Sequence, residues 1–292
     1  MQTNDPQPTP AADQNPPQLD IERLEADIEH RMATSHVPAL ALAIVTPQTT
    51  IYANGFGILS VDETDMLTTP NTLFRIASFT KPLVGTMIMR LQASGRLSID
   101  QPVTELVPAL RFQNEAYSQQ ITLRHLLSHT AGLRPTGVSG DNRTENVLAH
   151  LVTTELPHWP FFAPPGTLHA YSNLGLCVAG YVAEVLTQTP FEQLMKDEIF
   201  TPLGMYQTTF DPFMAMTFRV AQAHNLLSDG HLAVQRPLVH NAAFTPAGGA
   251  FSTVLDFVHF VQLRLNRGSV NGQVFLPTEL IDMMHHTDRL IP

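Results

Sequence analysis

The sequence predicts a mixed α/β fold in which helices outnumber the strands of a small antiparallel sheet. Apolar residues recur at helical spacing across residues 19–32, which indicates a first helix ending before Pro38. Two apolar runs, 40–45 and 50–56, are divided by a short polar stretch and predict a hairpin. Several apolar segments at helical spacing follow, so most of the remaining chain is expected to be helical.

Composition limits the classes of protein that need to be considered. The 292 residues are 43% hydrophobic and 14% charged, as in a globular protein large enough for one big domain or two intimate ones. A formal charge of −10 without a basic cluster argues against nucleic acid or an anionic membrane as a partner. The one cysteine, Cys177, lies among apolar residues and is expected to be structural.

The N-terminal residues 1–18 are rich in proline and lack periodicity, so they are expected to be a disordered tail. The longest apolar run, 37–45, is too short to span a bilayer, and no signal sequence precedes it. The chain as written is therefore expected to be soluble and cytoplasmic. A longer true N-terminus would make it periplasmic or secreted.

The most informative stretch is FRIASFTKPLVGTMIMRLQASG, in which Ser78 and Lys81 stand three residues apart at the start of a predicted helix, 78–94. Residues three apart share a helix face, so the lysine ammonium can reach the serine hydroxyl. Pro82 cannot donate a helical hydrogen bond, which predicts an irregular first turn. Taken alone, the pair is a weak signal, and a serine N-cap with a solvated lysine is the favoured interpretation.

Shorter helices are expected at 101–110, after a Thr122 cap, and from a Ser252 or Thr253 cap to about Asn266. His125 and His129 lie four residues apart and could share a metal ion, but no third ligand stands at a recognisable spacing. Hydrogen-bonded histidines are the better interpretation. No metal and no cofactor is predicted.

A second motif follows a proline–glycine turn, where PPGTLHAYSNLGLCVAG places Tyr171 and Asn173 at the start of another apolar helix. By itself this motif is equally compatible with a helix cap, because serine and asparagine favour helix starts. Together, two polar motifs about 90 residues apart, each at a helix entrance, are far more specific than either alone.

The chain resembles the serine β-lactamase and penicillin-binding-protein superfamily, nearest the class C β-lactamases and the β-lactamase-like esterases. The resemblance is carried in order by FRIASFTKP, LRHLLSHTAGL, PPGTLHAYSN, FEQLMKDEIFTPLGM and PAGGAFSTVLDFVHFVQLRLNRG. It implies Ser78 as the acylated nucleophile, Lys81 as its electrostatic partner, and Asn173 as a substrate-orienting amide. Tyr171 is implied as general base or proton shuttle, a role that remains divided between Lys81 and Tyr171.

The family's third motif, K-T-G or H-x-G on a C-terminal strand, does not occur after Asn173. We therefore expect a β-lactamase/transpeptidase-like fold whose antiparallel sheet lacks its C-terminal strands, as in a truncated product or fragment. The expected domain runs from 19 to 292, with an α/β part at 19–96 and 248–292 and a helical part at 97–247. An exposed sheet edge would then favour self-association.

The expected function is acyl transfer to water through an acyl-serine, on an ester, amide or β-lactam carbonyl of a small or peptide-like substrate. The alternative is a catalytically silent relative that binds a ligand or partner through the same cleft. An α/β-hydrolase is disfavoured because no G-x-S-x-G elbow occurs. A cysteine hydrolase built on Cys177 is disfavoured because apolar surroundings raise a thiol pKa.

Overall fold

The computed structural model describes residues 19–134, 140–144 and 146–286, and these divide into two compact units between Val37 and Pro38. The predicted tail, 1–18, lies outside the described residues. The first unit contains helix α1, Ile21–Thr34, as its periodicity predicts. The Asp20 carboxylate caps this helix by accepting the Arg23 N–H at 3.1 Å.

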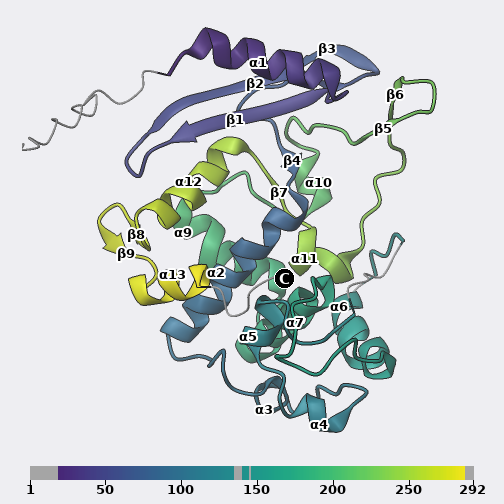
Figure 1. The fold of residues 1–292 in the computed structure, drawn as a ribbon, viewed down its shortest axis with the longest axis vertical. Helices are drawn as coiled ribbons and strands as arrows, with labels where there is room; N and C mark the ends of the chain where they lie inside the picture. The colour runs from purple at the N-terminus through teal and green to yellow at the C-terminus, as the bar shows by residue number, and fades with distance from the viewer. Residues whose placement is uncertain (1–18, 135–139, 145, 287–292) are drawn as a thin grey trace, which may run out of the picture. The chain divides into compact units, whose positions relative to one another are not determined.

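The second unit begins with an antiparallel sheet in the order β1-β2-β3 (Figure 1). The predicted hairpin is confirmed by β1, Ala39–Val45, and β2, Thr50–Ser60. A third strand, β3 at Glu63–Leu67, extends the sheet beyond the two strands that the sequence indicated. Its sequence ETDML has three polar residues and is mostly exposed, so it carries no apolar run by which to recognise a strand.

Strand β4, Phe74–Arg75, pairs with β7, Phe251–Ser252, and leads directly into the serine–lysine stretch. The predicted helix 78–94 is corrected at its start. A 3₁₀ turn covers Ala77–Phe79, and the α-helix α2 runs over Thr80–Ala93. The irregular entrance that Pro82 predicts is thus confirmed, and Ser78 lies in the 3₁₀ turn.

Most of the other elements of the second unit are short helices, and Figure 1 shows α2 running between α13 on one side and α7 and α11 on the other. The expected helix at 101–110 is only the single turn α3, and the span 97–247 also contains the hairpin β5–β6. The remaining helices are α3 (Val103–Leu106), α4 (Glu115–Ser118), α5 (Leu123–Leu127), α6 (Val147–His150), α7 (Asn173–Thr187), α8 (Phe191–Met195), α9 (Thr201–Leu203), α10 (Pro212–Ala215), α11 (Thr245–Gly248), α12 (Val254–Leu265) and α13 (Thr278–His285).

The second unit also contains two further two-stranded pairs: β5, His224–Leu226, with β6, Leu232–Val234, and β8, Ser269–Val270, with β9, Gln273–Val274. Short π-helical and 3₁₀ segments lie at η2 (Leu151–Glu155), η3 (Leu156–His158), η4 (Lys196–Phe200) and η5 (Ala242–Phe244). Within the ranges given above, no helix is both long enough and apolar enough to cross a membrane.

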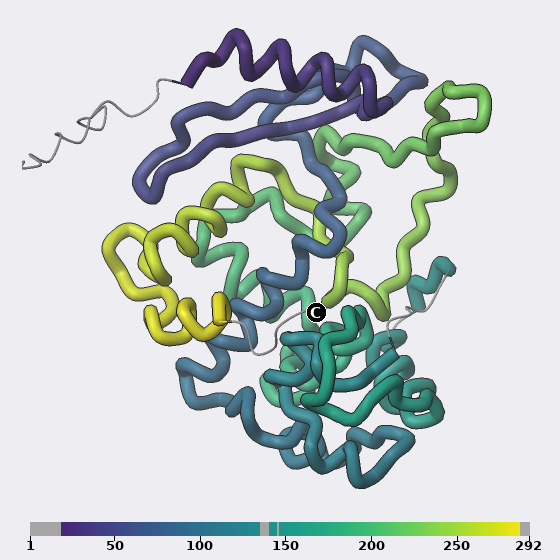
Figure 2. The backbone as a smooth tube through the Cα atoms, in the orientation of Figure 1, coloured from purple at the N-terminus to yellow at the C-terminus, as the bar shows by residue number. Residues whose placement is uncertain are grey.

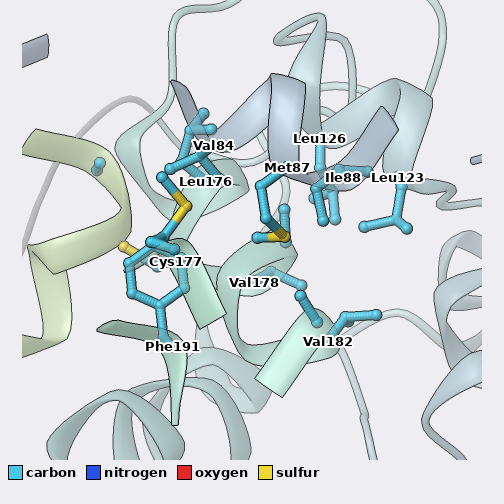
Figure 3. Close-up of a cluster of buried hydrophobic side chains, with 14 of the residues drawn as sticks. Val84, Met87, Ile88, Leu123, Leu126, Leu176, Cys177, Val178, Val182 and Phe191 are labelled. Atoms are coloured by element: carbon cyan, nitrogen blue, oxygen red, sulfur yellow. The ribbon is translucent and has the colours of Figure 1, made fainter. Parts of the chain in front are cut away.

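The core joins α2, α5 and α7, as Figure 3 shows for Met87, Leu126 and Val178 among other labelled side chains. Helices α5 and α7 approach closely, because a Cβ added to Gly175 would lie 2.7 Å from the Leu126 carbonyl oxygen. Cys177 is fully buried here, and burial raises the pKa of its thiol to about 12. Its predicted structural role is confirmed, and a thiol of this kind makes a poor nucleophile.

The cap of α12 is Thr253, whose hydroxyl accepts the Asp256 N–H at 3.0 Å. Asp256 stands in the first turn as predicted and accepts hydrogen bonds from Gln207 and Thr208. Ser252, the other candidate for the cap, belongs to β7, and its hydroxyl is hydrogen-bonded to the Thr208 hydroxyl instead. The cap thus orients α12 and the buried carboxylate that ties it to residues 207–208.

Replacing Thr253 with alanine should lower the free energy of unfolding by about 1 kcal/mol, because the Asp256 N–H loses its acceptor. Urea unfolding followed by circular dichroism measures the change. Thr253→Ser keeps the hydroxyl and serves as the matched control. Equal unfolding midpoints for Thr253→Ala and Thr253→Ser would show that the hydroxyl is not a significant cap.

Candidate active site

Three predicted site residues meet at one point although they lie far apart in the sequence. The Ser78 hydroxyl is 2.8 Å from the Tyr171 hydroxyl, which stands 93 residues away in the chain. Lys81 donates to the same serine oxygen at 3.0 Å. Tyr171 therefore lies within hydrogen-bond reach of Ser78.

A backbone carbonyl supplies a further contact that the motifs did not indicate. Lys81 donates to the Ala247 carbonyl oxygen at 2.6 Å. Ala247 belongs to α11, and Figure 2 shows this yellow-green stretch beside the first turn of the blue helix α2. The ammonium thus bridges α11 and Ser78, and its position is restrained by these two acceptors.

Neighbouring backbone contacts fix the position of that carbonyl. The pairing of β4 with β7 continues past the strands, where the Ile76 N–H donates to the Ala250 carbonyl oxygen at 2.9 Å. The buried Thr80 hydroxyl then accepts the Ala250 N–H at 3.2 Å. Residues on both sides of Ser78 are therefore tied to the segment that holds Lys81.

The peptide before the nucleophile is strained. Ala77 has a φ of +46°, a left-handed conformation that is uncommon for residues other than glycine. It opens the 3₁₀ turn that exposes Ser78, and the Ser78 N–H lies in the first turn, where helix geometry supplies no acceptor. Such an N–H is suited to receive negative charge developing on a substrate oxygen.

The electrostatics of Tyr171 favour its phenolate form. Burial raises its pKa, but hydrogen bonds with Lys81 and Ser78 and the positive charge of Lys81 outweigh burial, so its pKa lies below the ordinary tyrosine value. The Lys81 ammonium also lies 4.8 Å from the centre of the tyrosine ring. The lysine therefore stabilises the form of Tyr171 that can accept a proton.

Asn173 is the first residue of α7 and lies half-buried, two positions after Tyr171. In the part of the chain that the structure describes, its side chain makes no hydrogen bond with the other three site residues. The structure thus brings Ser78, Lys81 and Tyr171 into contact and places Asn173 beside them without a bond among them. Its role as a substrate-orienting amide stays a prediction.

The two histidines of the LRHLLSHTAGL segment are hydrogen-bonded. His125 completes a capping box with Thr122 at the start of α5, which confirms the predicted cap. His129 accepts the Ser172 N–H through Nδ1 at 3.2 Å. Over the described ranges, no three histidine, cysteine or carboxylate side chains are grouped to hold a metal ion.

A cavity of about 360 Å³ lies beside Lys81 and is lined by apolar residues together with several basic side chains. One of its arginines, Arg124, is paired with the Asp100 carboxylate at 2.6 and 2.9 Å. Another, Arg264, is half-buried and donates to the Met284 sulfur and to His285. The basic side chains in the lining are Lys81, Arg124, His169, Arg264 and His286.

Fold and site together give a mixed α/β protein in which a serine, a lysine and a tyrosine side chain lie within hydrogen-bond distance. Comparison with known families agrees. The model of the Beta-lactamase family matches residues 24–289, and the chain belongs to this family.

Individual relatives and solved structures agree with this assignment. Penicillin-binding protein 4 of Amycolatopsis lactamdurans is 29% identical over 235 residues, which are 80% of this chain and 61% of the relative. The octameric penicillin-binding protein homologue from Pyrococcus abyssi superposes with a TM-score of 0.79 and 28% identity, over 94% of this chain and 62% of that one. The D-alanine carboxypeptidase AmpC from Burkholderia cenocepacia superposes with a TM-score of 0.71 and 25% sequence identity, over 90% of this chain and 68% of that one.

The chain spans only part of the length of its curated relatives. It covers 61% of the Amycolatopsis protein and 49% of Protein flp from Staphylococcus aureus strain MW2, with which it is 27% identical over 251 residues. The range matched by the family model, 24–289, includes Ser78, Lys81 and Tyr171.

Replacing Lys81 with methionine should raise the pKa of Tyr171, because the phenolate loses both a hydrogen bond and a nearby positive charge. An ultraviolet titration of phenolate absorbance measures it, with Tyr171→Phe subtracted to isolate this tyrosine from the other four. Arg96→Met, at an exposed position on the far end of α2, is the charge-matched control. A Tyr171 titration unchanged in Lys81→Met would contradict the assignment.

Proposed function

We propose that the protein is a serine hydrolase that forms an acyl-serine at Ser78 and transfers the acyl group to water. One observation carries the proposal: the Ser78 oxygen is held between the Lys81 ammonium and the Tyr171 hydroxyl at 3.0 and 2.8 Å. A general base must lie within hydrogen-bond distance of the nucleophile whose proton it takes, and both of these distances meet that requirement. A serine cap with a solvated lysine does not require the tyrosine to be there.

The proposed reaction has two halves. In the first, the Ser78 oxygen bonds to the substrate carbonyl carbon while its proton passes to the Tyr171 and Lys81 pair, and the Ser78 N–H stabilises the oxyanion. The bond to the leaving group then breaks, and the same proton goes to that group. In the second half, water gives a proton to the pair and attacks the acyl carbon. The bond between the acyl carbon and the Ser78 oxygen then breaks, the pair returns its proton to that oxygen, and the acid is released.

The proposed substrates are esters, amides or β-lactams of small or peptide-like acids. Two lines of support narrow this set toward molecules that carry a carboxylate. The lining of the cavity beside Lys81 includes several basic side chains, which favour an anionic group. The related proteins are named as a penicillin-binding protein and a D-alanine carboxypeptidase, both of which point to β-lactam or peptide-like ligands. Asn173 is proposed to orient the substrate amide.

Ser78→Ala should abolish covalent labelling by a fluorescent penicillin or a fluorophosphonate, because both reagents need an activated serine. Gel fluorescence and mass spectrometry of the labelled peptide measure the result. Ser94→Ala, at an exposed serine just past the other end of α2, is the matched control and should label as the parent does. Labelling that persists in Ser78→Ala rules out this nucleophile.

The second candidate is a silent relative that binds a ligand through the same site. The sequence observation in its favour is that neither K-T-G nor H-x-G occurs after Asn173. The experiment above separates the two candidates. A parent protein that binds penicillin reversibly but forms no covalent adduct would favour the silent relative.

We also propose that the protein self-associates through the edge of its sheet. Among the described residues, β1 pairs with β2 alone, and its sequence ALALAIV is apolar throughout. An unblocked apolar edge is a template for pairing with another strand. Light scattering should give a mass that is a multiple of the monomer, and a monomer at every concentration would contradict this proposal.

A further inference from the structure

His129 lies against Tyr171 without touching Ser78. Its carbonyl oxygen accepts the Ala170 N–H at 2.8 Å, and its Nδ1 accepts the Ser172 N–H at 3.2 Å. These two donors are the N–H groups of the residues immediately before and after Tyr171. His129 is therefore hydrogen-bonded to the backbone on both sides of Tyr171.

The imidazole also packs against the tyrosine ring. The two ring centres are 4.7 Å apart, with planes inclined at 38°. The Lys81 ammonium lies 4.8 Å from the centre of the same ring. The Tyr171 ring thus lies against both the Lys81 ammonium and the His129 imidazole, while its hydroxyl is hydrogen-bonded to Ser78.

The bond from Ser172 fixes the protonation state of the imidazole. An Nδ1 that accepts a hydrogen bond carries no proton, so the ring is neutral with its proton on Nε2. The groups that face this ring are His169, whose ring centre lies 5.7 Å away, Lys81 and Tyr171. Burial, His169 and Lys81 lower the pKa of His129 to about 4, which keeps the ring neutral near pH 7.

The backbone of His129 is itself held in an unusual conformation. Its φ of +59° is left-handed, directly after the end of α5. The Thr130 N–H returns to the His125 carbonyl oxygen at 2.9 Å, and the Thr130 carbonyl oxygen accepts the Gly166 N–H at 2.7 Å. Asparagine, aspartate and histidine are the non-glycine residues found most often in this conformation, so the turn accepts a histidine here.

We infer that His129 is a positioning residue for the proposed reaction: by binding the peptide groups on both sides of Tyr171 and packing on its ring, it holds the tyrosine hydroxyl at Ser78. This inference rests on the proposed function. A neutral imidazole gives this support without adding a positive charge next to Lys81. Its loss should move the base and leave the nucleophile, the lysine and the substrate cavity in place.

The test compares two substitutions that each keep one half of the contact. His129→Asn keeps an acceptor at the place of Nδ1 and tolerates the left-handed backbone. His129→Phe keeps the ring contact and loses the acceptor. We expect kcat to fall by about 10–100-fold in His129→Phe, as for a small misplacement of a catalytic group, with KM changed less than about threefold. His129→Asn should retain kcat within about fivefold.

A double-mutant cycle separates positioning from general loss of structure. In a Tyr171→Phe background, His129→Phe should cause no further loss of kcat, because the group it positions is already absent. His125→Asn is the matched control, since His125 also forms a structural hydrogen bond in the same segment but lies outside the site. Its kcat per folded molecule should equal that of the parent, even where its melting temperature falls.

Two outcomes would overturn the inference. One is a His129→Phe enzyme with the parent's kcat, and the other is a loss that is undiminished in the Tyr171→Phe background. Failure of the proposed function gives a different result. Ser78→Ala is assayed in parallel, and activity that survives in it removes the proposed nucleophile whatever the His129 variants do.

Discussion

The site depends on one shared atom, the Ser78 oxygen, which is hydrogen-bonded to both Lys81 and Tyr171. The lysine arrives on α2 and the tyrosine just before α7, so the contact exists only while these two helices keep their relative position. A displacement of about 1 Å in such a site can cost two orders of magnitude in rate. The structure meets this demand with a close-packed core, in which α5 contacts α7 at Gly175 and Cys177 is fully buried.

Backbone atoms do much of the positioning around that oxygen. The Ala247 carbonyl oxygen accepts a hydrogen bond from the Lys81 ammonium and so restrains its position. The pairing of β4 with β7 in turn restrains the segment that follows Ala247. The His129 carbonyl and imidazole grip the peptide on both sides of Tyr171. Main-chain groups are well suited to this task because they have no rotamers to lose, and their direction is set by the elements that contain them. The reactive side chains are thereby restrained with little cost in side-chain entropy.

This division explains which features could be predicted from the sequence. The apolar runs of β1 and β2, the Thr253 cap and the meeting of Ser78, Lys81 and Tyr171 all rest on side-chain patterns, and each is present. Strand β3 was missed because ETDML has no apolar alternation. The Ala247 carbonyl was missed because any residue type carries one. Ser78 in a 3₁₀ turn instead of an α-helix reflects Pro82 and the ladder to Ala250, of which only the proline is visible in the sequence.

The protonation of His129 is linked to the charge state of the whole site. Lys81 must stay positively charged to stabilise a Tyr171 phenolate, and a cation of this kind disfavours a second positive charge on a buried ring nearby. His129 accepts the Ser172 N–H through Nδ1, which must therefore be unprotonated. The positive charge of Lys81 favours this neutral ring and so favours the hydrogen bond that holds the backbone beside Tyr171. Conversely, a protonated ring would lose its acceptor and release Ser172, because both ring nitrogens of an imidazolium are donors. The arrangement therefore couples the position of the proposed base to its acidity through a residue that never contacts the nucleophile.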